Sequence, residues 1–331
     1  MGKFLTIGAS MLLAGCATRT VDSALMSLSV DPVPAQETTT VAEPSREQSA
    51  TSTGESANVM TGQANGEAKH APWEQRLIDP VTAPFLFETP VIHSTVQPVF
   101  LRHEFPGTSI LGGGNLRGYA VQLRYALNDD LAFIAIKDGR IDYNPGGASD
   151  ATGWGDLSGG LKYKVYEDLD AGEIVSVGFT YEATQGSRQV LQGNGEGGWH
   201  PFVSAGWDDG ENNAIASIGA YLPVDGDAES QYINYHLHYS WEIDEVFVPL
   251  VEINGLHYTN NGRALPVNQE GVDYANIGAN NVEGNDIITG AVGFRWRFSE
   301  NIDFGLAYED TLTAREDVFG NRVTADMIWR Y

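Results

Sequence analysis

The sequence has very little cysteine and little positive charge. Its 331 residues include one cysteine, Cys16, so no disulfide can form within the chain. The 19 lysines and arginines stand against 44 aspartates and glutamates, which gives a formal net charge of −25. A chain this acidic is repelled by phosphate backbones, so we expect no nucleic-acid partner.

Long apolar runs and catalytic motifs are also missing. The apolar stretch at residues 4–13 is too short to span a bilayer as a helix, and no later segment sustains the 3.6-residue period of an amphipathic helix. The chain has no Walker A loop, dinucleotide fingerprint, CxxC pair or G-x-S-x-G elbow. We therefore expect no enzyme, no cofactor and almost no helix after the first residues.

What the sequence does contain is alternation of apolar and polar residues, most clearly at its C-terminus. Because strand side chains alternate with period two, the last nine residues predict a strand with one apolar face. A chain that stops within such a strand on an aromatic residue resembles the assembly signal of bacterial outer-membrane β-barrels, which the barrel-assembly machinery reads. The apolar face, and with it the proposed signal, consists of Val323, Ala325, Met327, Trp329 and Tyr331.

Eleven further segments show the same alternation. Each is about eight to twelve residues long, which is the length that a tilted strand needs to cross a bilayer. The clearer ones are 119–127, 157–165, 175–182, 233–242, 288–298 and 302–309, and the weaker ones are 98–105, 131–138, 199–207, 213–222 and 246–257. The sequence therefore predicts an all-β protein, with a single antiparallel transmembrane β-barrel of about twelve strands over residues 98–331.

The connections between these segments alternate between long and short. The longer set is 106–118, 138–156, 184–198, 223–230, 258–286 and 311–321. Transmembrane barrels have this arrangement, with long outer loops and short periplasmic turns. A lipid-anchored soluble β-sandwich stays open as an alternative, because its apolar faces could pack against each other.

The N-terminus carries an export signal. One positive charge and the apolar residues 4–13 lead into Leu13-Ala14-Gly15-Cys16, which resembles the bacterial lipobox. We expect a lipoprotein-type signal peptide over residues 1–15, lipidation at Cys16 and location in the bacterial outer membrane. Residues 16–72 are polar and aperiodic, which predicts a disordered linker. Residues 73–97 contain prolines and aromatics and predict a lead-in segment that packs across the periplasmic mouth or inside the lumen.

Two short Gly-rich motifs carry a family resemblance. Trp154-Gly155-Asp156-Leu157, followed by Gly160-Leu161-Lys162-Tyr163, resembles the signature of small outer-membrane transporter-like barrels. That family is often labelled the MetA-pathway-of-phenol-degradation family and is loosely akin to channels of the fatty-acid-transporter type. The resemblance implies a channel or transporter for small molecules, with hydrophobic or aromatic ones among the candidates, and contact with outer-membrane lipid.

The polar face of the strands supplies the candidate site residues. Charges of both signs inside a barrel tune which solutes pass, or else pair with one another and close it. We expect these side chains to line the lumen: Arg102, Arg124, Lys162, Lys164, Glu182, His236, His238, Glu242, Glu252, Arg295, Arg297, Asp303 and Glu309.

Several functional alternatives stay open. Twelve strands lie between the filled eight-stranded barrel and the open sixteen-stranded porin, so strand number does not decide whether the lumen is open. The barrel could be a membrane anchor whose long loops, 258–286 especially, bind a partner. His236 and His238 point the same way and could bind Zn²⁺, but a tetrahedral site needs further ligands, so no metal is expected. His103 and His257 are read as outward-facing.

Overall fold

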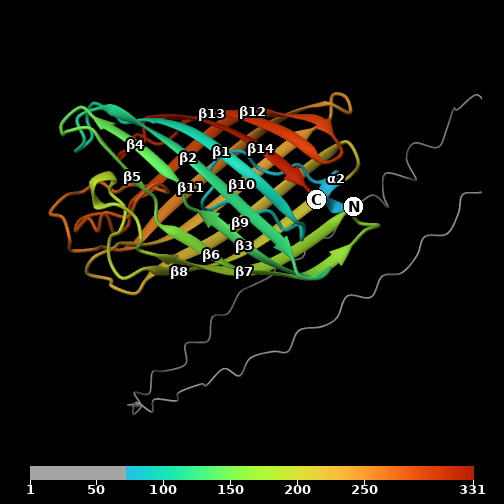
Figure 1. Cartoon of the computed structure of the whole chain (residues 1–331), viewed down its shortest axis with the longest axis horizontal. Helices are drawn as coiled ribbons and strands as arrows, with labels where there is room; N and C mark the ends of the chain where they lie inside the picture. Colours follow the sequence, from blue (N-terminus) through green and yellow to red (C-terminus); the bar gives the residue numbers. More distant parts are fainter. Residues whose placement is uncertain (1–71) are drawn as a thin grey trace, which may run out of the picture. The chain divides into compact units, whose positions relative to one another are not determined.

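The computed structural model describes residues 72–331, which form a closed antiparallel β-barrel (Figure 1). The predicted signal peptide, the lipidation at Cys16 and almost all of the predicted linker lie outside the described residues. The wall strands are β1 (Thr95–Glu104), β2 (Gly114–Ala126), β3 (Leu131–Lys137), β4 (Arg140–Pro145), β5 (Ala151–Trp154), β6 (Leu157–Asp168), β7 (Glu173–Ala183), β8 (Gly198–Asp208), β9 (Asn212–Pro223), β10 (Gln231–Trp241), β11 (Phe247–Asn260), β12 (Asp286–Ser299), β13 (Ile302–Thr311) and β14 (Asn321–Arg330).

From β6 to β14 each strand pairs with the next one along the chain, β2 pairs with both β3 and β4, and β1 closes the barrel. Strand β1 pairs with β2 on one side and with β14 on the other, so the sheet has no free edge along β1. The alternative of a soluble β-sandwich is wrong, because one continuous sheet curves round on itself rather than forming two stacked layers.

Two wall strands are interrupted. Strand β4 continues β3 after Asp138 and Gly139, and β5 precedes β6 across Gly155 and Asp156, so the fourteen assigned strands make twelve crossings. Gly139 has φ +107°, and a Cβ there would lie 2.2 Å from the carbonyl oxygen of Tyr119. The prediction of residues 138–156 as a loop is wrong, because β4 and β5 extend the wall above this break.

The connections sort by length as the sequence predicts. At one end, which we call the long-loop end, lie residues 105–113, 146–150, 184–197, 224–230, 261–285 and 312–320. The other end, which we call the short-turn end, carries the short turns, the C-terminus and the first described residues (Figure 1). Helical structure within residues 72–331 is limited to α2 (Trp73–Arg76) and the 3-10 turn η2 (Arg188–Val190).

The outer face of the wall is apolar. Alternate residues of each strand project outward with large exposed side chains, among them Tyr119, Val121, Leu123 and Tyr125 of β2. Such a band suits the hydrocarbon of a bilayer, and its aromatics suit the headgroup level. On β14 the exposed face includes Met327, Trp329 and Tyr331, while Val323 and Ala325 are partly exposed on the same side. The role of this face in assembly stays a prediction.

No helix within residues 72–331 is long and apolar enough to cross a bilayer.

Candidate functional site: the occupied lumen

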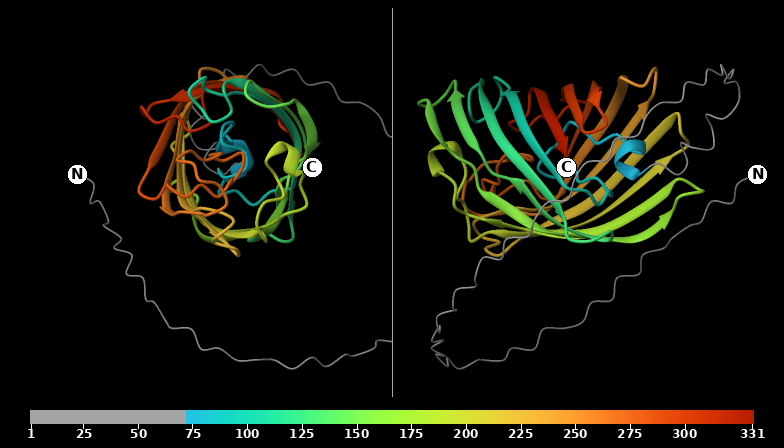
Figure 2. Two further views of the ribbon diagram at one scale, coloured as in Figure 1. Left: turned by 90° about the vertical axis from the view of Figure 1, so that its left-hand side faces the viewer. Right: turned by 45° about the vertical axis from the view of Figure 1, so that its right-hand side comes forward.

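Residues 73–94 lie inside the barrel, where Figure 2 shows them as a blue coil within the ring of strands. We call this segment the inner plug. Its backbone is bound by the wall: the Glu252 carboxylate accepts the N–H groups of Val81 and Thr82 at 2.9 and 2.8 Å. The guanidinium of Arg295 donates to the carbonyls of Asp79 and Pro80 at 2.6 and 2.7 Å. The segment predicted as a lead-in thus occupies the lumen, and its end at Thr95 enters β1 directly.

A buried carboxylate fastens the middle of the plug. Glu88 accepts two hydrogen bonds from Arg124, at 2.9 and 2.7 Å, and one from Lys162 at 2.7 Å. All three side chains are buried, and Lys162 is 0% exposed. Two cations on the wall therefore share one anion on the plug. Without that anion both would be buried without a counter-charge.

Further ion pairs fix the plug near the short-turn end. Asp79 pairs with Arg330 at 3.2 Å, and Arg76 pairs with Asp208 at 2.9 Å. Arg330 also pairs with Asp303 at 2.7 Å. The inner plug thus forms ion pairs with both β8 and β14.

Apolar contacts complete the docking. Leu77, Phe87 and Val91 pack against wall residues Ile174 and Ile215 in one buried cluster. The Phe87 ring also stacks on the His236 imidazole, with centroids 5.0 Å apart. The plug therefore combines a polar clamp with a small core of its own, as a folded element does.

The long-loop half of the lumen is filled by a second segment. Residues 261–285, which we call the outer plug, fold back into the barrel mouth, and Val272, Tyr274, Ile277 and Val282 are buried there. The long loop predicted over residues 258–286 is thus present, but part of it is packed inside the barrel mouth.

One arginine ties the outer plug to the wall. Arg322 of β14 donates to both oxygens of Asp273 at 2.9 and 2.8 Å and to Glu309 of β13 at 3.0 and 2.8 Å. Its side chain is 2% exposed. A guanidinium suits this place, because its planar fork can satisfy two carboxylates at once.

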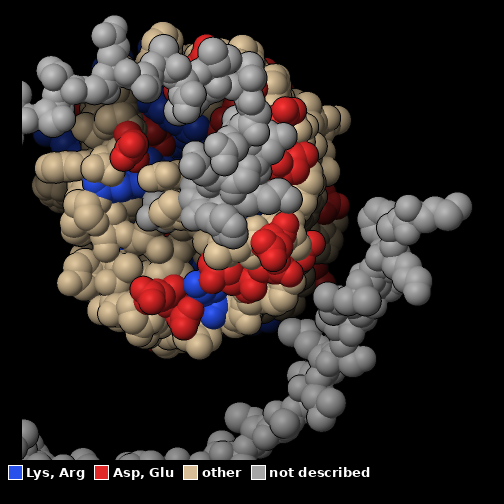
Figure 3. All heavy atoms as spheres, turned by 90° about the vertical axis from the view of Figure 1, so that its right-hand side faces the viewer, with Lys and Arg blue, Asp and Glu red and all other residues tan. Residues whose placement is uncertain are grey.

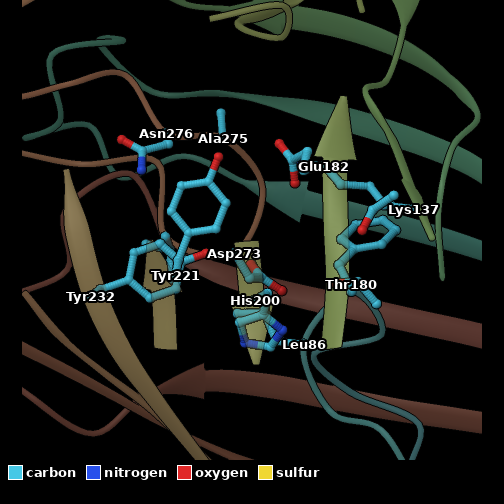
Figure 4. Close-up of a pocket in the computed structure, with 13 residues that line it drawn as sticks. Leu86, Lys137, Thr180, Glu182, His200, Tyr221, Tyr232, Asp273, Ala275 and Asn276 are labelled. Carbon is cyan, nitrogen blue, oxygen red and sulfur yellow. The ribbon is translucent and has the colours of Figure 1, made fainter. Parts of the chain in front are cut away.

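Little space is left between the two plugs. The cavity in Figure 4 measures about 20 Å³, which is close to the room that one water needs. Its lining comes from the wall, the inner plug and the outer plug, and includes Lys137, Glu182, His200, Tyr221, Leu86, Asp273 and Asn276. A larger vestibule of about 590 Å³ opens at the short-turn end, where Arg297, Glu242 and Asp303 line it. Figure 3 shows acidic side chains clustered around that end.

The structure places most of the candidate residues inside the barrel. Arg124, Lys162, His236, His238, Glu252, Arg295, Asp303 and Glu309 are buried there. Lys137 of β3 binds Glu182 at 2.8 Å, Arg297 binds Glu242 at 2.7 Å beside the vestibule, and Lys164 binds Glu167 at 2.9 Å.

The prediction that Arg102 lines the lumen is wrong. Its side chain is 48% exposed on the outer face, where it pairs with Glu104 at 2.7 Å. The reason is that Val99 and Leu101 are apolar yet face inward, because they pack beside the plugs. The prediction that His103 faces outward is also wrong, because the residue is fully buried and its imidazole contacts the Val318 carbonyl at 2.9 Å.

The two lumen histidines serve as hydrogen-bonding groups. His236 contacts Asn254 at 2.8 Å, and His238 contacts Glu252 at 2.8 Å and Ser240 at 3.1 Å. Within residues 72–331 no group of three or more His, Cys, Asp or Glu side chains is placed to hold a metal ion.

Sequence reasoning missed the anions of both plugs. Asp79, Glu88 and Asp273 lie outside the strands, in segments without periodicity, so no alternation marks their direction. The strand residues predicted for the lumen carry similar numbers of cations and anions, so their charge balance gave no signal for these three carboxylates either.

The buried carboxyl group of Glu229, at the long-loop end, is expected to make the stability of the protein depend on pH. Burial, with the nearby Glu182 carboxylate, raises the pKa of Glu229 to about 8 from the ordinary 4.5. Its Oε1 accepts the Tyr221 hydroxyl at 3.0 Å, while Oε2 is buried with no hydrogen-bond partner in the described chain. The folded state keeps this carboxyl protonated between about pH 4.5 and 8, where the unfolded chain ionises it, so the group lowers stability progressively as pH rises across that window.

We therefore expect Glu229→Gln to remove a pH-dependent loss of stability. The wild type should melt at about the same temperature as the variant at pH 5 and below it at pH 9, as followed by circular dichroism in detergent. Glu283→Gln, at an exposed position, is the matched control and should show the same change in melting temperature between pH 5 and pH 9 as wild type. Parallel melting curves for wild type and Glu229→Gln at both pH values would contradict the assignment.

The chain was compared with known proteins. No family model matches it, and no curated protein matches it, so membership of the family suggested by the Gly-rich motifs stays a prediction. Among solved structures it is similar to the COG4313 outer membrane channel from Pseudomonas putida F1, with 14% identity and a TM-score of 0.53 over 77% of this chain and 100% of that one. It is also similar to the NanC porin, with 10% identity and a TM-score of 0.47 over 72% of this chain and 100% of that one. The likeness to the first of these structures concerns the fold, a twelve-stranded antiparallel β-barrel.

Proposed function

We propose that the protein is an outer-membrane channel or transporter for small molecules, exported by its N-terminal signal and tethered through a lipidated Cys16. The observation that carries the proposal is the pairing of an apolar outer wall with a lumen lined by buried charges, which the inner and outer plugs neutralise. A mere anchor needs no such lining, because apolar side chains could fill its interior at lower cost. The same charges face a solute once the plugs move aside.

The geometry favours a gated passage over a permanently open one. The inner plug fills the short-turn half of the lumen and the outer plug fills the long-loop half, and the space between them holds about one water. Both obstacles stand in series, so a solute passes only when both are displaced. Hydrophobic or aromatic solutes suit the aromatic residues that surround the outer plug, including Tyr221, Tyr232 and Phe319.

Planar-bilayer conductance tests the proposal. A variant that lacks residues 73–94 and carries a short Gly-Ser turn in place of residues 263–281 should conduct steadily, whereas wild type should conduct rarely. Each single change should give intermediate behaviour, because one obstacle remains. A deletion of equal length within residues 31–52 is the matched control. Silence from a double variant that still shows heat-modifiable gel mobility would rule out passage through the lumen.

The alternative of a surface barrel whose long loops bind a partner has less support. The loop with the greatest length, 261–285, is folded into the mouth, and Val272, Tyr274 and Val282 are buried there rather than presented to a partner.

A further inference from the structure

Positive charge on the outer face of the barrel is confined to one place. Within residues 72–331, Arg102 of β1, Arg117 of β2 and Arg140 of β4 are the basic side chains that project outward from the wall strands. The other lysines and arginines of the strands point into the lumen or lie at its rim, and the rest belong to the inner plug or the long loops. Three outward arginines on three hydrogen-bonded strands are notable in a chain with a net charge of −25.

The register brings these arginines together. Arg102 lies directly opposite Arg117, and Arg140 lies opposite Tyr119, the next outward residue of β2. Like charges directly opposite on antiparallel strands repel, so such a pair needs an anion nearby to be stable. Arg102 pairs with Glu104 at 2.7 Å and Arg140 with Asp142 at 3.3 Å. Asp142 lies directly opposite Arg117 on β4, but its carboxylate pairs with Arg140, and Arg117 forms no ion pair within residues 72–331.

The patch lies at the edge of the apolar band. Phe100 and Tyr119 are the next outward residues toward the short-turn end, and their rings are 5.4 Å apart. Beyond Tyr119 the outward residues of β2 are apolar or aromatic through Leu127. Because aromatic rings mark the headgroup level of a bilayer, the arginines lie at the headgroups of the leaflet on the long-loop side.

A groove in the outer wall begins at the patch. It encloses about 560 Å³ where the wall is interrupted between β3 and β4, and Arg140 is at its rim. Asp138 also lines it, but that carboxylate accepts the Val121 N–H at 2.9 Å. The remaining lining is mostly apolar and includes Pro98, Phe100, Tyr119, Val121, Trp154, Phe304 and Met327.

We propose that this patch and groove bind a phosphorylated, acylated glycolipid of the leaflet on the long-loop side. A phosphate sits at Arg117 between Arg102 and Arg140, and an acyl chain follows the groove below them. Guanidinium groups suit this ligand, because they bind phosphate oxygens in pairs and at fixed geometry. The proposal depends on the barrel's location in that membrane but not on passage of a solute.

Native mass spectrometry of the full-length protein in detergent, titrated with bisphosphorylated lipid A, tests the site. Arg117→Gln/Arg140→Gln should bind lipid A at least about tenfold more weakly than wild type, as expected for the loss of charge-assisted contacts. Arg188→Gln/Arg263→Gln removes the same charge from exposed loop positions and should bind as wild type does. Both double variants should keep heat-modifiable mobility, since the changed side chains are exposed.

Two further binding measurements distinguish recognition of the lipid's phosphate and acyl chain together from binding of phosphate alone. Dephosphorylated lipid A should bind to wild type as weakly as lipid A binds to Arg117→Gln/Arg140→Gln, and inorganic phosphate should not displace lipid A, because the groove holds an acyl chain. Equal binding of lipid A to wild type and to that variant would overturn the proposal. So would equal binding of phosphatidylglycerol and lipid A to wild type, because the site would then recognise charge alone. The result is independent of conductance, so the channel proposal can fail while this one stands.

Discussion

Glu88→Gln is expected to release the inner plug while leaving the barrel wall folded. The change keeps the shape of the side chain but removes the only carboxylate that Arg124 and Lys162 share at 2.7–2.9 Å. Breaking a buried ion pair by removing one partner costs about 3–5 kcal/mol, because an uncompensated charge stays buried. Undocking exposes both cations to water, so the cost falls on the docked state.

Hydrogen exchange of the backbone amides in residues 77–91 measures this effect. A loss of about 3 kcal/mol corresponds to protection lower by about a hundredfold, since each 1.4 kcal/mol is a factor of ten. Glu104→Gln is the matched control, because it breaks an exposed pair with Arg102 and such pairs contribute about 1 kcal/mol or less. Protection in Glu88→Gln within twofold of wild type would show that the ionic clamp does not hold the plug.

Arg322→Met is expected to free the outer plug and to destabilise the barrel as well. Without the guanidinium, the carboxylates of Asp273 and Glu309 stay buried near each other with no cation between them. The cost is again about 3–5 kcal/mol, and here the mutual repulsion of two anions adds to it. Because Asp273 belongs to the outer plug, moving that segment away relieves the repulsion.

The temperature at which heat-modifiable mobility is lost should therefore fall, and exchange within residues 270–282 should rise. Arg322→Met/Asp273→Asn/Glu309→Gln should recover most of the loss, since it leaves neither carboxylate charged and buried without its cation. Arg263→Met, at an exposed pair with Asp227, is the control. A triple variant no more stable than Arg322→Met would mean that packing of the arginine stem, rather than its charge, holds the outer plug.

The wall strands could be predicted from the sequence because the pattern that identifies each strand lies within that strand. Alternation with period two identifies a strand and its faces from eight to twelve neighbouring residues, and the lengths of the connections give the two ends. This prediction fails at β1, where Val99 and Leu101 face inward although they are apolar, so the pattern loses its phase and Arg102 is misplaced. It also fails at β4 and β5, where the break at Gly139 hides the continuation of the wall.

The sequence by itself therefore determined a closed, lipid-facing barrel with a charged interior, because each strand's pattern depends only on its own residues. Only the tertiary structure decided what fills that interior. The contacts between Glu88 and Arg124, or between Arg322 and Asp273, join segments 36 and 49 residues apart, and neither Glu88 nor Asp273 lies in a periodic segment. Which anion meets which lumen cation is set by proximity after the barrel closes, and a local pattern carries no information about that proximity.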